Sequence, residues 1–427
     1  MQQLTTNRAA VLRVMERAQA ALEQQAAGAG PALAAAAPAG PVSPGEAAEL
    51  AAQLRSAREW AHTSEPGMME KTDELDELAP GGGDYVSHHR VIAQTQAAME
   101  QFADEVPGTA GPDDDEEVPL DLLIGVLSFL VRDKAKFRTH QSLDDLVSPL
   151  DANATVVVVG DFGTAKQRAI RVAQAIRGVD PDHVIHLGDV YPTGTPALVR
   201  RHFIDVMRTH GPAGAKFWAL NGNHEMAARG IGYFNDILPF CGQRASYFSL
   251  QNEHWKLIGL DTAYREHDLQ AEQKPWLHAR LREGTSRNIL LTHHQMFSAD
   301  DGRPHDNRHR LTTTMQEFVQ TGRIFGWFWG HEHRFLSYAR DPAFGGYLAR
   351  SLGHGGKRIK YVTGEHRFPA PPVVHYWEAR RPQTADECLN GFAILRFAGP
   401  EVTLSYADET GFEWNTEIWP GRPHGTP

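Results

Sequence analysis

Five short polar motifs recur, in order, through the last two-thirds of this 427-residue chain. They combine the carboxylate, amide and imidazole groups that hold metal ions through oxygen and nitrogen. The motifs are Gly160-Asp161-Phe162-Gly163, Gly188-Asp189-Val190-Tyr191, Gly222-Asn223-His224-Glu225, Thr292-His293-His294 and Gly330-His331-Glu332-His333. This set predicts a site for two cations, which can neutralise a phosphate ester and activate water at neutral pH.

Each of the first three motifs directly follows an apolar run that is typical of a buried β-strand. The runs are Thr155 to Val159, His183 to Leu187 and Lys216 to Leu220. Sheet-based enzymes gather their ligands just past the carboxyl ends of strands. We therefore expect these motifs to meet at one edge of a sheet.

The elements after residue 150 predict an α/β fold. Helical segments at Thr164–Arg177 and Thr195–His210 separate the early strands, which favours parallel pairing, whereas a hairpin around Gly399-Pro400 favours an antiparallel edge. Further strands are expected at Ser246–Leu250, His254–Leu260, Ile289–Thr292, Ile324–Trp329, Gly391–Phe397 and Val402–Tyr406. We expect residues 151–427 to form one catalytic domain of two stacked mixed β-sheets with helices outside.

Residues 1–150 predict an acidic, helical N-terminal region with disordered linkers. The expected helices cover Thr5–Gln25, Ala47–His62 after a Ser43-Pro44-Gly45-Glu46 capping box, His88–Val106 and Pro119–Phe137. The expected linkers include the Ala/Gly/Pro stretch Gly28–Pro41 and the acidic run Asp113–Glu117. We interpret the region as a helical appendage that packs on the enzyme, binds a protein partner or self-associates.

Charge and composition exclude several classes of partner. The net charge of the chain is −11, because residues 1–150 hold 24 acidic and 11 basic residues (−13), whereas residues 151–427 hold 29 acidic and 31 basic residues (+2). No basic stripe for binding duplex nucleic acid is visible.

Two cysteines make no disulfide framework and suit a reducing compartment. The longest apolar stretch, Leu122–Val131, is far below the ~20 residues of a spanning helix. No secretion signal is recognisable, so we expect a soluble cytoplasmic protein.

The motif order resembles that of the calcineurin-like metallophosphoesterase superfamily, whose blocks run D-x-[HG], G-D-x-x-[DY], G-N-H-[ED], a histidine at a strand end, and G-H-x-H. The resemblance covers about residues 153 to 410, and includes Gln273-Lys274-Pro275-Trp276-Leu277 as the family's Q-x-x-W-L helix. It implies a four-layer sandwich of two sheets flanked by helices. It also implies two metal ions per chain, held by Asp161, Asp189 as the bridge, Asn223, His293, His331 and His333.

The same resemblance implies roles for the residues after Asn223. His224 would contact the phosphate and protonate the leaving oxygen, and Glu225 would orient His224. The expected reaction is hydrolysis of a phosphomonoester or phosphodiester by attack of a metal-bound hydroxide. Small phosphoesters, nucleotides and phosphoproteins all remain candidate substrates.

Two positions depart from the family pattern. In most members the first block is D-x-H, and that histidine is a metal ligand, but here the position is Gly163. The purple acid phosphatase branch, the closest motif pattern, has D-x-G and a tyrosine three residues after the bridging aspartate. Here Tyr191 comes one place earlier and would reach the metal only through a reshaped loop. Phenolate would favour trivalent iron, and without it manganese, iron or zinc would serve.

Other residues have a functional and a structural interpretation. His294 resembles the second histidine of the family's H-H pair and is a candidate substrate contact, with a packed strand-end histidine as the alternative. Arg303 and His305 are candidates for a polar lid that receives substrate, with a solvated loop as the alternative. His354 lies in a glycine turn that is a candidate to approach the site, and we interpret it as a plain turn. Hydrogen-bonded or apolar core positions are expected for His186, Trp327 and Trp329.

The alternative to an enzyme is a non-catalytic, metal-binding interaction protein on the same fold. Loss of the usual histidine at position 163 motivates it. The presence of His224 beside a complete ligand set argues against it, because a scaffold has no need of an acid at the phosphate.

Overall fold

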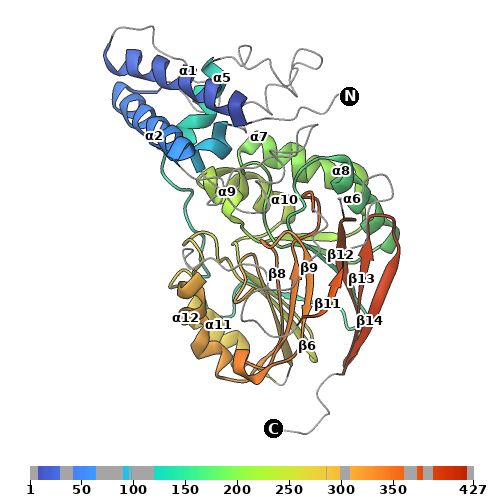
Figure 1. Ribbon diagram of the computed structural model, residues 1–427. Helices are drawn as coiled ribbons and strands as arrows, with labels where there is room; N and C mark the ends of the chain where they lie inside the picture. Colours follow the sequence, from blue (N-terminus) through green and yellow to red (C-terminus); the bar gives the residue numbers. More distant parts are fainter. Residues whose placement is uncertain are drawn as a thin grey trace. The chain divides into compact units, whose positions relative to one another are not determined.

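The structure of the chain is a computed structural model that describes residues 8–28, 42–63, 90–95, 98, 120–284, 286–298, 308–359, 373–377 and 388–420. These residues form two compact units, which are described separately (Figure 1). The first comprises the described residues up to Ala135 with Tyr191–Leu198 and Ala227–Ile231. The second comprises Lys136–Val190, Val199–Met226 and the described residues from Gly232 onward.

The second unit is an α/β fold with two mixed sheets, as predicted. In order across the larger sheet the strands are β1 (Val147–Pro149), β5 (Phe248–Gln251), β6 (Trp255–Gly259), β7 (Arg287–Thr292), β8 (Ile324–Trp329), β10 (Leu348–Leu352), β9 (Phe335–Tyr338) and β11 (Val373–Trp377). The smaller sheet runs β14 (Glu413–Trp419), β13 (Glu401–Asp408), β12 (Gly391–Ala398), β2 (Thr155–Val159), β3 (His183–His186) and β4 (Lys216–Ala219).

Strand directions follow the expected pattern. Strands β2, β3 and β4 pair in parallel in the smaller sheet, and β6, β7, β8 and β10 do so in the larger one. Strands β12 and β13 form the antiparallel hairpin. The described residues also form five strands that were not predicted, β1, β9, β10, β11 and β14, which extend the two sheets at their edges.

The two sheets pack face to face through alternate residues of their strands. Val156 and Val158 of β2 share one buried cluster with Ile289 and Leu291 of β7. Leu290, between them, joins a second cluster on the other face of the larger sheet. This two-residue period is what a strand buried on both faces requires.

Helices cover the outer faces of this unit. Helices α11 (Gln273–Arg282) and α12 (Arg308–Val319) contribute Trp276 and Leu311 to the cluster with Leu290, and Figure 1 shows both helices beside the larger sheet. The predicted helix at Thr164–Arg177 is confirmed as α6 (Gln167–Val179). The further helical segments of this unit are the π-helical η2 (Arg200–Ile204), α8 (Asp205–His210), α9 (Asn223–Ala227), the π-helical η3 (Tyr233–Ile237), α10 (Leu238–Cys241) and the 3₁₀ turn η4 (Pro342–Phe344). The short helix α7 (Pro196–Val199) belongs mainly to the first unit.

The first unit is helical, with α1 (Arg8–Ala26), α2 (Pro44–Thr63), α5 (Leu120–Leu127) and the 3₁₀ turn η1 (Ser128–Leu130). Residues 90–95 are helical as well. The predicted apolar stripe of α1 is buried in one cluster with residues of α2 and α5. None of the helices in the described ranges combines the length and apolar composition needed to cross a membrane.

The predicted helix Pro119–Phe137 is wrong in its second half. Helix α5 ends at Leu127 and a 3₁₀ turn follows. The Ser128 hydroxyl donates to the carbonyl of Gly125 at 2.7 Å, which competes with helical pairing, and residues 133–140 have no regular secondary structure. The linker residues 29–41, the acidic run Asp113–Glu117 and most of the helix expected at His88–Val106 lie outside the described residues.

The capping box at the start of α2 is confirmed. The Ser43 backbone N–H donates to Glu46 Oε2 at 2.8 Å, and the Glu46 backbone N–H donates to Ser43 Oγ at 3.3 Å. We expect Ser43→Ala to destabilise α2 by about 1 kcal/mol, because the Glu46 backbone N–H loses the Ser43 hydroxyl that accepts it. Native-state hydrogen exchange of the α2 amides should accelerate about fivefold. Ser56→Ala, at an exposed position of the same helix, is the matched control and should leave exchange unchanged or slower. Equal exchange in both variants would contradict the prediction.

Candidate metal centre

The five motifs follow the carboxyl ends of five parallel strands of the second unit. Asp161, Asp189 and Asn223 come after β2, β3 and β4, and His293 and His331 come after β7 and β8 of the other sheet. The two sheets are linked here directly, because the His293 Nδ1–H donates to the carbonyl of Leu187 at 2.9 Å. This bond leaves Nε2 of His293 as the nitrogen that can bind a cation.

One group of possible ligands surrounds the side-chain oxygen of Asn223. Its Oδ1 atom lies 2.9 Å from His293 Nε2 and 3.0 Å from His331 Nδ1. His293 Nε2 also lies 3.3 Å from Asp189 Oδ1. Asp189, His293 and His331 each place one ligand atom within 4.8 Å of the others.

A second group shares Asp189 with the first. It consists of Asp161, Asp189 and His333, again with ligand atoms within 4.8 Å of one another. His333 Nε2 lies 3.5 Å from Asp161 Oδ1, and the His331 backbone N–H donates to Asp161 Oδ2 at 2.8 Å. Among the described residues, Asp189 is the carboxylate that these two groups share.

Buried charge concentrates at Asp189. Burial by itself would raise the pKa of this carboxyl, but the imidazoles of His293, His224 and His331 outweigh burial and hold its pKa well below the usual range. Burial lowers the pKa of His293, but the Asp189 charge and hydrogen bond and the Asp161 charge prevail and raise it to about 9. A site that favours a proton so strongly is one where a metal cation can replace the proton.

Tight turns bring the ligands this close. Asp161, Asp189 and His331 have positive φ values of 55°, 76° and 66°, which non-glycine residues rarely adopt. Gly222 has no room for a side chain, because a Cβ atom there would lie 2.2 Å from Asp189 Oδ1. The glycine of the G-N-H-E motif thus lets the backbone approach the Asp189 carboxylate.

Comparison with known proteins agrees with this geometry. Residues 154–335 match the family model of the calcineurin-like phosphoesterases. This segment belongs to the metallophosphoesterase superfamily. The match covers the strands and motifs from β2 to the end of the G-H-x-H block.

Sequence relatives of this metallophosphoesterase segment include two acid phosphatases and a probable diesterase. Human tartrate-resistant acid phosphatase type 5 is 22% identical over 309 residues, which are 60% of this chain and 87% of that protein. The rabbit protein of the same name is 23% identical over 183 residues, 42% of this chain, and the chain spans about half of its length (49%). A probable cyclic nucleotide phosphodiesterase of Synechococcus is 30% identical over 136 residues, 31% of this chain and 46% of that protein.

Among solved structures, the chain is similar to "GAP50 the anchor in the inner membrane complex of Plasmodium". The two share 11% identity with a TM-score of 0.48, over 64% of this chain and 91% of that one.

The missing histidine of the first metallophosphoesterase block has a steric explanation. A Cβ atom on Gly163 would lie 2.8 Å from Val190 Cα, because the two residues form a parallel β-bridge beside Asp189. No side chain fits at this position while the bridge exists. Tyr191 is buried, and its role as a ligand stays a prediction.

The residues after Asn223 are arranged differently from expectation in one respect. His224 is buried, with Nε2 3.9 Å from Asp189 Oδ2. Glu225 was expected to orient His224, but its Oε2 accepts the backbone N–H groups of Gly222 and Asp189 at 2.9 and 3.1 Å. Glu225 therefore holds the two metal-site turns together. Burial and the nearby Asp189 charge raise the pKa of Glu225 to about 8.

The glycine turn at His354 supports the site, a role that the sequence did not reveal. The Gly355 N–H donates to the carbonyl of Gly160 and the Lys357 N–H to that of Asp161, at 2.9 and 3.1 Å. A Cβ atom on Gly353 would lie 2.0 Å from the Glu332 carbonyl oxygen. The turn therefore fixes the backbone of the first metallophosphoesterase motif, and only its glycine spacing could have signalled this.

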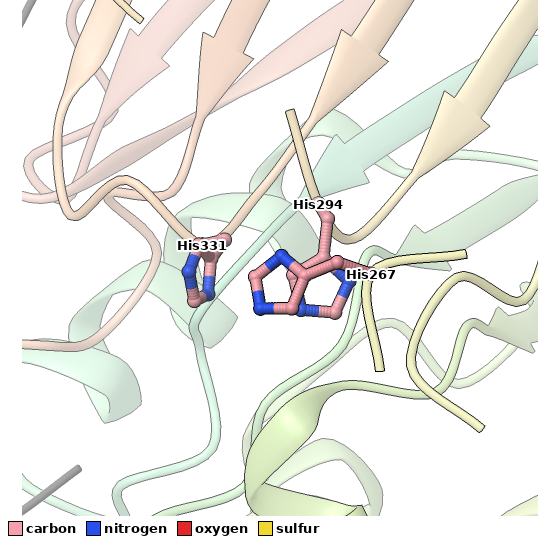
Figure 2. A group of neighbouring side chains, drawn as sticks. All are labelled: His267, His294 and His331. Carbon is pink, nitrogen blue, oxygen red and sulfur yellow. The ribbon is translucent and has the colours of Figure 1, made fainter. Parts of the chain in front are cut away.

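His294 is placed beside the centre, together with a residue that the sequence did not single out. Its Nδ1 lies 2.9 Å from Thr262 Oγ1, and its ring centroid lies 3.8 Å from that of His267 (Figure 2). Burial, with the charges of His267, His293 and His331, lowers the pKa of His294 well below its usual range, so the ring is neutral. Its role as a substrate contact stays a prediction. Arg303 and His305 lie outside the described residues.

The predicted core residues are buried. Trp327 and Trp329 belong to the cluster that faces α11 and α12. His186 stacks on Phe203 with a centroid distance of 4.7 Å. Its expected hydrogen bond is wrong, because neither ring nitrogen has a hydrogen-bond partner among the described residues. Burial lowers its pKa to about 4, so the ring is neutral at pH 7.

Gly222→Ala tests the close approach of the Gly222 backbone to the Asp189 carboxylate. The added methyl group must push Asp189 away, so we expect loss of bound metal and a destabilisation of roughly 1–3 kcal/mol. Metal content after purification without chelator and the thermal midpoint are the measurements. Gly214→Ala is the matched control, since its Cβ atom would meet nothing within 4 Å. Retention of full metal content by Gly222→Ala would show that Asp189 does not bind where these distances indicate.

Proposed function

We propose that this protein is a binuclear metal-dependent phosphoesterase that hydrolyses phosphomonoesters or phosphodiesters. The observation that carries the proposal is the membership of Asp189 in both ligand groups, with Asp161 and His333 on one side and His293 and His331 on the other. A shared carboxylate between two nitrogen and oxygen donor sets is the arrangement that two-metal phosphoester hydrolysis needs.

The donor types fit two metal ions and narrow their identity. One group offers two carboxylates and one imidazole, and the other offers a carboxylate, the Asn223 amide oxygen and two imidazoles. Such mixed sets suit iron, manganese or zinc, whereas structural zinc prefers closed cysteine and histidine shells. When bound, the ions would neutralise the phosphate and activate water at neutral pH.

His224 is the residue proposed to deliver a proton to the leaving oxygen. It follows Asn223 at the start of α9, and its backbone N–H donates to Asp189 Oδ1 at 3.1 Å, which fixes its position relative to the carboxylate. Burial of its ring excludes bulk water from competing for the proton. A positioned acid of this kind contributes about 10²–10⁴-fold to the rate.

The relatives leave two ester classes open. Two of them are named acid phosphatases and one a probable cyclic nucleotide phosphodiesterase. Hydrolysis of monoesters and of diesters can use the same metal centre. We therefore propose that the loops around this centre determine which of the two ester classes binds. The candidate substrates are small phosphoesters, nucleotides and phosphoproteins.

Asp189→Asn is the primary test. Loss of the bridging charge should reduce bound metal from near two per chain and lower the hydrolysis of p-nitrophenyl phosphate and bis-p-nitrophenyl phosphate by roughly a thousandfold or more, since each ion contributes several kcal/mol. Asp205→Asn, at an exposed position of α8, is the matched control and should behave as wild type. The ratio of the hydrolysis rates of the two substrates distinguishes a monoesterase from a diesterase. Absence of turnover in the wild type with manganese, iron or zinc bound would favour the non-catalytic interaction protein.

His224→Gln separates proton delivery from metal binding. We expect two metals per chain, as in wild type, with kcat for an alkyl phosphate reduced about 10²–10⁴-fold. The loss should be smaller for p-nitrophenyl phosphate, because p-nitrophenolate leaves with little help from a proton. Equal losses for both substrates would exclude His224 as the acid.

A further inference from the structure

Three imidazoles gather beside the Asp189 centre. Figure 2 shows the rings of His267, His294 and His331 facing a common region. Their centroids are 3.8 Å (His267 to His294), 4.8 Å (His294 to His331) and 5.5 Å (His267 to His331) apart. One ring nitrogen of each lies within 4.8 Å of the other two.

The backbone holds all three residues in place. His294 and His331 follow the paired strands β7 and β8, and His267 belongs to the connection between β6 and α11. That connection is tied to α11, because the Gln273 side chain bonds both the N–H and the carbonyl of Asp261, at 2.9 and 2.8 Å. Glu266 and His267 have consecutive positive φ values of 51° and 59°.

The ring of His294 has one nitrogen satisfied and one directed at its neighbours. Thr262 Oγ1 accepts the His294 backbone N–H at 3.2 Å and lies 2.9 Å from His294 Nδ1. With Nδ1–H donating to Thr262, Nε2 presents a lone pair. Nε2 is buried and has no hydrogen-bond partner among the residues that the structure describes. Buried polar atoms are nearly always satisfied, so this nitrogen indicates a ligand.

We propose that His267, His294 and His331 form a third cation site, which takes Zn²⁺ or another divalent ion that prefers imidazole. Tetrahedral zinc with Zn–N distances of about 2.0–2.1 Å separates its ligand nitrogens by about 3.4 Å, which small side-chain rotations can reach from the observed spacing. Three protein ligands leave a fourth position for water or an anion such as inorganic phosphate.

The ligand types distinguish this site from the two sites at Asp189. It has no carboxylate, so hard cations such as Mn²⁺ and Mg²⁺ should not bind it. Its zinc affinity should be lower than that of the two sites at Asp189, because it carries no negative charge and would lie beside two bound cations. This proposal rests on the proposed function only because the two share His331, whose Nδ1 faces Asn223 in the centre at Asp189. Because Nδ1 faces Asn223, three ions can bind together only if His331 holds the third through Nε2, and its ring must then lose its remaining proton.

Zinc stoichiometry of the His267→Gln variant tests the proposal without using activity. The chelator-stripped full chain is dialysed against rising Zn²⁺, and bound metal is counted by mass spectrometry. We expect three Zn²⁺ per wild-type chain and two per His267→Gln chain. The zinc affinities of the two tighter sites of His267→Gln should stay within about twofold of those of wild type. Third-site affinity should fall at least about 100-fold. With Mn²⁺ both proteins should bind two ions. His278→Gln, on the surface of α11 beside Glu317, is the matched control and should keep three Zn²⁺.

The outcomes separate this proposal from the proposed function. Saturation of the wild type at two Zn²⁺, or a third ion retained by His267→Gln, would overturn the third site. Retention of the two tighter sites by His267→Gln shows that the variant is folded. If Asp189→Asn leaves the tighter sites unchanged while His267→Gln removes the weaker one, the binuclear centre is wrong and the imidazole site stands.

Discussion

The buried carboxylate of Asp189 needs positive charge close by, and this requirement organises the rest of the site. A carboxylate removed from water is costly unless cations or donors compensate it. Here His293 lies 3.3 Å away, His224 donates its backbone N–H, and a second carboxylate, Asp161, belongs to the same ligand group. The protein has concentrated negative charge at a point that only a cation can balance well.

Glycines and strained turns make that concentration possible. The ligands sit on turns with positive φ, and Gly222, Gly163 and Gly353 lie where a Cβ atom would collide with backbone or carboxylate atoms. Such strain persists only where surrounding structure supports it. The two stacked sheets supply this support, because their buried apolar faces fix the strand ends from which every turn begins.

The predicted centre and the additional histidines differ in how they are built. Residues at the ends of paired strands are brought together by register, as Thr292 opposite Trp329 shows for the segments that carry His293 and His331. His267 reaches the centre from an irregular connection whose course depends on hydrogen bonds to Gln273 and Asp261. Tertiary contacts therefore place His267 beside the centre, and no periodic pattern in the sequence predicts this position.

The sequence by itself determined the α/β class, most inner strands and the strand-end motifs, because period and turn chemistry are local properties. The sequence did not predict the strands β9, β10 and β11 or the early end of α5. The strands form because they pair at the edge of a sheet, and α5 ends early because of one Ser128 hydrogen bond. Only the tertiary structure showed that Glu225 accepts hydrogen bonds from both turns, that the His354 segment supports Asp161, and that the ring of His267 lies against that of His294. These contacts join residues up to about two hundred positions apart, and no local spacing encodes them.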